Sequence, residues 1–299
     1  MKVGRLHDTI EHISVEGAES SSRVIPANTL LLVVRGMALA KMLPIAITQR
    51  PMAFNQDLKA LIPKPGIAGA FLYYWFVANA DYVLSKADEA AHGTKRLQTP
   101  TLEELTLLLP EERRHQDEIV EQIAVLDDHL ENCERRITLL EESANLVFTE
   151  WFVRLRFPGH AAASSCNTIP EGWHDAPLGK YVELNYGKSL KESDRQVGDV
   201  PVYGSSGIVG THATALSQGP AIIVGRKGNV GSVFYSPVPF FPIDTVYFIA
   251  SEQTSFFLLH TLRRMNFISS DAAVPGLNRN YAYSQPVIWP TNGVLLTFQ

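Results

Sequence analysis

Three glycines in the second half of this 299-residue chain are spaced in a way that first suggests catalytic chemistry. Gly225, Gly228 and Gly231 form a GxxGxxG sequence, which binds phosphate when a helix follows the loop. Here strand-like segments lie on both sides, at 221–224 and 233–235, and no GK[ST] ending is present. The pattern therefore predicts a hairpin with tight turns.

A second candidate is Asp57-Leu58-Lys59, which resembles the end of a metal-nuclease motif but has no partner carboxylate upstream. A buried, hydrogen-bonded Asp57 explains the pattern better than a catalytic one. The sequence also lacks HExxH and GxSxG motifs and any paired His/Cys cluster suited to a metal. We therefore predict a non-catalytic chain that holds no metal or cofactor of its own.

Polar, glycine-rich loops carry side chains that are better suited to recognising DNA. Arginine and asparagine or glutamine pair with base edges, whereas lysine, serine and main-chain amides bind phosphate. In the second half we predict DNA contacts from Lys188, Tyr203, Ser205, Ser206, Arg226, Lys227, Asn229, Asn278 and Arg279. The corresponding residues of the first half are Arg35, Lys95, Arg96 and Gln98. The alternative is that these loops are ordinary solvated turns.

The elements that must hold these loops form an internal repeat. Four features recur in the same order: the apolar segments 31–36 and 222–227, the Phe-x-x-Asp sequences 54–57 and 241–244, the amphipathic segments 71–76 and 256–260, and the pairs 97–98 and 277–278. We predict an α+β protein with two similar mixed α/β domains, residues 1–109 and 158–299.

A long helix, residues 110–157, is predicted to join the two domains. Its apolar residues alternate in steps of four and three, which is the heptad pattern of a coiled coil. The seam comprises Ile119, Ile123, Leu126, Leu130, Ile137, Leu140, Val147 and Trp151, with Cys133 and Ala144 completing the series. Such a seam needs a second helix to cover it, and the chain has no other heptad run.

The net charge of −5 argues against nucleic acid at first sight, but it is unevenly distributed. Residues 111–157 carry 12 acidic and 6 basic side chains, and the flanking segments are close to neutral. Local basic patches can therefore still meet phosphate. Two isolated cysteines and the absence of an apolar run of about 20 residues favour a cytoplasmic protein without a membrane span.

The motifs together resemble the specificity subunit of a type I restriction–modification system. The resemblance is carried by residues 178–181, 186–190, 201–207, 225–228, 242–245 and 274–279, and by the boundary at Pro110 that leads into the heptad helix. It implies two target-recognition domains that each read half of a bipartite duplex, with the helix as spacer. It also implies DNA methyltransferase and restriction–translocation subunits as partners, to which S-adenosylmethionine, ATP and Mg²⁺ would belong.

The sequence predicts two differences between this chain and that family. The first domain lacks its opening strands, so it is incomplete at its N-terminal side, and no long helix follows Pro290. A homodimer through residues 119–151 would supply the missing helix, and a truncated product is the other interpretation. From a different class, a non-catalytic coiled-coil scaffold with protein-binding end domains would also explain the seam.

Overall fold

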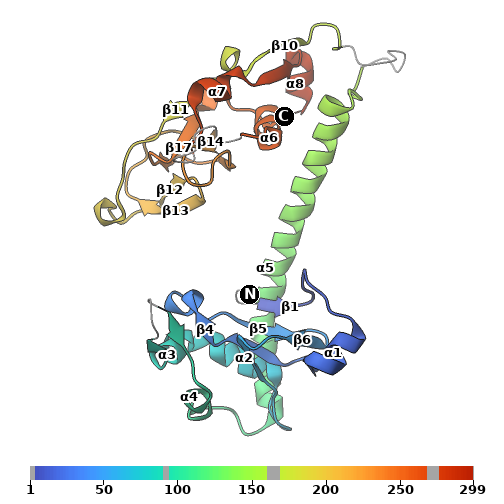
Figure 1. Ribbon diagram of the computed structural model, residues 1–299, viewed down its shortest axis with the longest axis vertical. Coiled ribbons are helices and arrows are strands. Elements are labelled where there is room, and N and C mark those ends of the chain that lie inside the picture. The colour runs from blue at the N-terminus through green and yellow to red at the C-terminus, as the bar shows by residue number, and fades with distance from the viewer. Residues whose placement is uncertain (1–3, 90–93, 160–168, 268–275, 299) are drawn as a thin grey trace. The chain divides into compact units, whose positions relative to one another are not determined.

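The computed structural model describes residues 4–89, 94–159, 169–267 and 276–298. The chain forms two compact units, residues 1–136 and 137–299, called here the first and second units. The division falls inside helix α5 (Arg113–Phe148), which has 36 residues. Figure 1 draws α5 as one continuous helix. A helix is therefore confirmed within the predicted range 110–157, and it is followed by a π-helical turn over Thr149–Val153.

The first unit is organised by a four-stranded sheet of order β1-β5-β3-β7, in which β3 is antiparallel to both neighbours and β1 is parallel to β5. Its strands are β1 (Gly4–Leu6), β5 (Ile45–Thr48), β3 (Leu30–Val33) and β7 (Leu58–Leu61). Two smaller sheets pair β2 (Arg23–Ile25) with β6 (Met52–Phe54), and β4 (Arg35–Gly36) with β9 (Lys95–Arg96) and β8 (Asp88–Glu89). The helices are α1 (Val15–Ser21), α2 (Gly69–Ala78), α3 (Ala80–Ser85) and α4 (Thr99–Glu103).

Helix α2 covers the central strands of the first unit. Strand β3 is an uninterrupted apolar run, as expected for a strand buried on both faces. Leu30, Leu32 and Ile45 from the sheet pack with Tyr73 and Phe76 from α2 in one core. The segment 71–76 is therefore part of a helix that packs on the core, as predicted, but this helix is apolar on all sides and not amphipathic.

The second unit has a sheet of order β11-β17-β14-β15, and all of its strand pairs are antiparallel. Its strands are β11 (Asn185–Tyr186), β17 (Val246–Ile249), β14 (Ala221–Gly225) and β15 (Val233–Ser236). A second sheet contains β13 (Gly207–His212), β12 (Val200–Gly204) and β16 (Phe241–Pro242), and a third pairs β10 (His174–Pro177) with β18 (Pro286–Trp289). The helices are α6 (Phe256–Arg264), α7 (Arg279–Ser284) and α8 (Asn292–Phe298).

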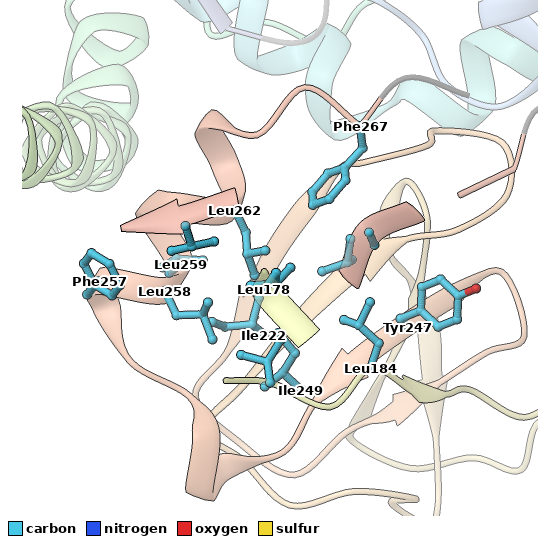
Figure 2. Packing of buried hydrophobic residues seen from close by; sticks show 14 of the residues in the cluster. Leu178, Leu184, Ile222, Tyr247, Ile249, Phe257, Leu258, Leu259, Leu262 and Phe267 are labelled. Carbon is cyan, nitrogen blue, oxygen red and sulfur yellow. The ribbon is translucent and has the colours of Figure 1, made fainter. Parts of the chain in front are cut away.

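The core of the second unit lies between helix α6 and the β14–β17 strand pair. Figure 2 shows Leu258, Leu178, Ile222 and Ile249 gathered there, with Tyr247 at one side of the cluster. Phe148, the last residue of α5, belongs to the same cluster and contacts Phe257. The C-terminal end of α5 is therefore part of this core.

Strand pairing shows that the two units share an arrangement of three strands. It also corrects the predicted alignment of the two repeats, which is wrong by one residue. Strand β3 lies between β5 and β7 as β14 lies between β15 and β17. Leu97 N–H donates to Val34 O (2.9 Å), and Leu277 N–H donates to Arg226 O (2.8 Å). Val34 therefore corresponds to Arg226, and Arg35 corresponds to Lys227.

The same shift changes the equivalence of the aspartates. Val34 N–H donates to Asp57 O (3.1 Å), and Arg226 N–H donates to Thr245 O (2.9 Å), so Asp57 matches Thr245 rather than Asp244. The first unit has a valine where the second has Arg226.

One further expectation is corrected at the end of α5, where the chain meets α8. The short helix α8 follows Pro290, and its Phe298 packs on Phe152 with ring centroids 4.9 Å apart. Trp151 does not continue the α5 seam. It lies in the π-helical turn and packs against Phe298 (5.7 Å) at the edge of the core. Among the described residues, no helix has the length and apolar character needed to cross a membrane.

Candidate nucleic-acid interface

Three segments that are distant in sequence meet at one edge of the second unit: strand β11, the β14–β15 loop and the start of helix α7. Arg226 begins the loop, and its main chain binds Thr245 on one side and Leu277 on the other. Lys227 also forms an isolated β-bridge with Gly276, just before α7. The loop and the N-terminal end of α7 are therefore fixed to each other by backbone hydrogen bonds.

The centre of this edge is an arginine–tyrosine cluster made of Arg226, Arg279, Tyr186, Tyr247 and Tyr283. The Arg226 guanidinium carbon lies 5.0 Å from the ring centroid of Tyr186 and 5.6 Å from that of Tyr247. The Arg279 guanidinium carbon lies 5.1 Å from the Tyr186 ring and 5.9 Å from the Tyr283 ring. Both arginines thus contact the ring of Tyr186, and these distances are typical of cation–π interactions.

Local backbone geometry explains why these side chains are held in place. A Cβ atom at residue 187 would lie 2.0 Å from the carbonyl oxygen of Ile243, so only glycine lets β11 pass this close. Asn278 caps helix α7, because its side-chain oxygen accepts hydrogen bonds from the N–H groups of Asn280 (2.8 Å) and Tyr281 (3.2 Å). Arg279 is consequently fixed at the first position of that helix.

The β14–β15 loop is compact and tied to the β12–β13 turn. Asn229 donates its side-chain N–H to Ser206 Oγ (3.1 Å), and Ser232 Oγ donates to Ser205 O (2.6 Å). A Cβ atom on Gly225 would lie 2.1 Å from the carbonyl oxygen of Asn229, so the loop can close only on glycine. The antiparallel pairing of β14 with β15 confirms the predicted hairpin at the GxxGxxG sequence.

The predicted contact residues of the second unit differ in their accessibility. Ser206, Lys188, Lys227 and Asn229 are exposed, and Arg226 and Arg279 are partly buried. Tyr203 is corrected to a core residue: it is 6% exposed and packs on Phe240, so a duplex cannot reach its ring. Ser205 is also buried, and the side-chain oxygen of Asn278 is engaged in capping α7.

The electrostatics of this edge favour an anionic ligand. Within the described ranges, the ion pairs involve none of Arg226, Arg279, Lys188 and Lys227. Burial raises the pKa of the Tyr247 hydroxyl, and the neighbouring Tyr186 hydroxyl adds to the shift. The Tyr247 hydroxyl therefore stays neutral at physiological pH. It donates a hydrogen bond to Leu277 O (3.1 Å), and the ring of Tyr247 contacts Arg226.

Sequence reasoning identified the arginines but missed their aromatic partners. Tyr186, Tyr247 and Tyr283 are not among the predicted contact residues, although Tyr186 lies two residues before the predicted contact Lys188. Residues 186, 226 and 279 are far apart in the chain, so only the tertiary fold brings them together. The signal available in the sequence is the aromatic residue that directly precedes Gly187 and Lys188.

In the first unit one of the predicted cations, Arg35, is ion-paired with a carboxylate, and Lys95 and Arg96 lie opposite acidic residues in a β ladder. The Nε atom of Arg35 lies 3.5 Å from an Asp57 side-chain oxygen, and the backbone of Arg96 pairs with Asp88 across the β8–β9 ladder. Gln98 donates to the Asp88 carboxylate (2.6 Å). Lys95 lies opposite Glu89 in the same ladder. Asp57 is thus about half exposed and ion-paired, which corrects the expectation of a buried aspartate.

The described residues contain no group of three or more His, Cys, Asp or Glu side chains that could hold a metal ion. The edge of the second unit brings together cations, aromatic rings and the exposed amide of Asn229. The fold and the site therefore define a two-unit recognition protein built on a long helix.

The comparison with known families identifies the family to which the chain belongs. The family described as "Type I restriction modification DNA specificity domain" matches residues 7–142 and 170–283, so the chain belongs to that family. The two matched segments include the three repeated strands of each unit, β3, β5 and β7 in the first and β14, β15 and β17 in the second. The family is one of DNA specificity domains, in agreement with the prediction of a non-catalytic subunit.

Two curated relatives are themselves specificity subunits. The chain is 27% identical over 180 residues to that of the type I restriction enzyme MjaIX of Methanocaldococcus jannaschii, a match covering 59% of this chain and 40% of the relative. It is 29% identical over 142 residues to the EcoR124I/EcoR124II specificity subunit of Escherichia coli, covering 46% of this chain and 35% of the relative. The match thus spans less than half of each relative.

The fold is shared with a solved specificity subunit. The crystal structure of the type I restriction–modification S subunit from M. genitalium aligns with a TM-score of 0.53 at 18% identity, covering 91% of this chain and 73% of that one. At this identity the likeness shows a common fold.

Proposed function

We propose that this chain reads a DNA sequence and delivers partner enzymes to it as the specificity subunit of a type I restriction–modification system. The observation that carries the proposal is the edge of the second unit, where Arg226, Arg279, Lys188 and Lys227 gather without carboxylate partners among the described residues. A cationic surface rich in amides and arginines fits the phosphates and base edges of a duplex. Membership of a DNA-specificity family supports the same conclusion.

In this proposal each unit contacts one half of a bipartite target. The second unit uses the arginine–tyrosine cluster, Lys188, Lys227 and the Asn229–Ser206 pair. The first unit uses Arg35, Lys95, Arg96 and Gln98, which lie on or beside its β4-β9-β8 sheet. Because the cations of the first unit have acidic neighbours, we expect the second unit to supply more of the salt-dependent affinity.

We propose that the exposed stripe of α5 is covered by a second helix. Ile119, Ile123, Leu126, Leu130, Ile137, Leu140 and Val147 are 37–67% exposed. Apolar residues at heptad spacing on a helix surface favour coiled-coil pairing. A second copy of this chain can supply that helix. The seam ends at Val147, because Trp151 packs against the core.

The double variant Ile123→Asp with Leu130→Asp tests this homodimer. Charges in a buried seam lose hydration, so the variant should behave as a monomer in light scattering while the native chain is a dimer. A matched control places aspartate at Val125 and Leu139, exposed apolar residues of the same helix that lie two positions after Ile123 and Ile137 and so outside the seam. Equal masses for the native chain and the seam variant would contradict the homodimer.

The proposed partners follow from the same family. They are double-stranded DNA, DNA methyltransferase subunits and restriction–translocation subunits, with methyl donor, nucleotide and Mg²⁺ held by those partners and none by this chain. Such a complex would act in the cytoplasm, where the host DNA lies.

Duplex binding tests the proposed function directly. Host methylation sites provide the candidate bipartite motif, and fluorescence anisotropy then compares a duplex carrying it with a scrambled duplex, with methyltransferase subunits present. Selective binding that weakens steeply with salt is expected. Equal affinity for both duplexes would refute sequence recognition. Stable capture of a protein partner without any duplex binding would favour the scaffold alternative.

A further inference from the structure

We propose that Tyr186 is a positioning residue that holds Arg226 and Arg279 together as a clamp for DNA backbone phosphate. The inference rests on the proposed function and deepens it, because it assigns the two arginines to the backbone instead of to base edges. Tyr186 is 49% exposed, and the guanidinium carbons of both arginines lie about 5 Å from its ring.

The first step of the argument is that both arginine side chains are folded back onto their own unit. The Arg226 guanidinium donates to the main-chain oxygen of Asp244 (3.3 Å) while it lies against Tyr186 and Tyr247. Arg279 lies against Tyr186 and Tyr283. The major groove is about 8.5 Å deep, so a base-reading arginine must extend away from its domain. These two side chains are instead partly buried against their own unit.

The second step concerns repulsion between the two arginines. Two cations that share one neighbouring ring repel each other unless something holds them, and the electron-rich face of a tyrosine attracts both. Tyr186 is itself fixed, because its ring packs edge-to-face on the buried Tyr247 (5.1 Å) and the chain passes tightly through Gly187. The ring is therefore a rigid support for two charges that have no ion-pair partner among the described residues.

The third step is the chemistry of the ligand. Guanidinium groups bind phosphate oxygens in a forked, charge-assisted geometry, and ordering them in advance lowers the entropic cost of binding. A clamp of this kind contributes equally to every sequence. Discrimination then falls to exposed groups such as Asn229 and Ser206 on the neighbouring loops.

The experiment compares Tyr186→Leu and Tyr186→Phe with the native chain, in complex with methyltransferase subunits, on target and scrambled duplexes across a salt series. Tyr186→Leu removes the aromatic face, so binding should weaken about tenfold on both duplexes. The slope of log affinity against log salt should become shallower by about 1–2, as for the loss of one or two phosphate contacts. The target-to-scrambled ratio should not change, and Tyr186→Phe should bind like the native chain.

Two controls separate positioning from a structural role. Phe256→Leu removes an exposed aromatic of the same unit that contacts Tyr235, and it should leave the salt slope unaltered. In a chain already carrying Arg226→Gln and Arg279→Gln, adding Tyr186→Leu should have no further effect on affinity, because the tyrosine acts through those arginines.

Three results would overturn the inference: an unchanged salt slope in Tyr186→Leu, a fall in the target-to-scrambled ratio at constant slope, or a full additional loss in the Arg226→Gln/Arg279→Gln background. A native chain that shows no salt-dependent duplex binding would instead overturn the proposed function, and this inference with it. The outcomes are distinct because the first three leave native binding intact.

Discussion

Gln116 offers a sharp test of how the first unit holds the start of α5. This side chain is only 1% exposed. Its oxygen accepts from Ala68 N–H (2.8 Å), and its nitrogen donates to the main-chain oxygens of Gly66 (3.2 Å) and Pro110 (2.9 Å). One glutamine therefore ties the segment before α2 and the segment before α5 to the helix. Gln116→Met keeps the length of the side chain and removes all three hydrogen bonds.

The expected cost follows from the burial of each partner. Ala68 is buried, so its N–H loses its partner without access to water, which costs about 1–3 kcal/mol. The Gly66 and Pro110 carbonyls lie nearer the surface and can be hydrated again, so each adds about 0.5 kcal/mol. The total is a loss of about 2–4 kcal/mol in the free energy of unfolding of the first unit, with no effect on the second.

Urea unfolding monitored by hydrogen exchange resolves the two units. Gln116→Met should lower the protection of residues 68–78 and 113–120 and leave that of residues 221–225 at the native level. Gln122→Met is the matched control, because Gln122 lies on the same helix and is exposed, and its effect should stay within about 0.5 kcal/mol. Equal destabilisation by the two variants would refute the reasoning.

Three other perturbations give independent checks. Gly225→Ala places a Cβ against the carbonyl oxygen of Asn229, so urea unfolding should show a loss of about 2 kcal/mol, and a neutral effect would contradict the tight loop. Asp57→Asn releases Arg35 from its ion pair, so anisotropy at low salt should show two- to threefold tighter duplex binding, which is about 0.4–0.7 kcal/mol. The stability of the fold should be almost unchanged. Weaker duplex binding would count against the proposed role of Arg35. Burial and two nearby arginines lower the pKa of His260, so the unfolded chain takes up a proton below about pH 6.5 more readily than the folded state does. The free energy of unfolding should therefore fall between pH 7.5 and 5.5, and His260→Gln should flatten that pH dependence in urea titrations. An unchanged pH dependence in His260→Gln would exclude His260 as its source.

The repeated sheets and the long helix were predictable because they depend on local patterns. A four–three spacing of apolar residues indicates a helix without reference to the rest of the chain, and an apolar run between glycine-rich turns indicates a buried strand. The register of the repeat was not predictable in the same way. Strands β3 and β14 are apolar at consecutive positions, so they lack the alternation that would fix the alignment to one residue.

The candidate site was only partly predictable. Residue types pointed to Arg226 and Arg279, but the sequence could not show that both would lie against Tyr186, because that contact joins three separate segments. The sequence likewise gave no sign that Tyr203 would be buried, since the strand and loop around it contain the small polar residues that are typical of surfaces.

The π-helical turn after α5 has a consequence for how the helix can vary. Arg154 N–H bonds to Thr149 O, five residues earlier, so this turn holds one residue more than a regular helical turn. The extra residue rotates everything beyond it by about 100° around the helix axis. One uninterrupted heptad pattern is thereby divided into an outward stripe before Phe148 and an inward anchor after it. Deleting a single residue from that turn ahead of Trp151 would give a regular helix in which Trp151 keeps its present orientation, so the inward anchor would survive the loss.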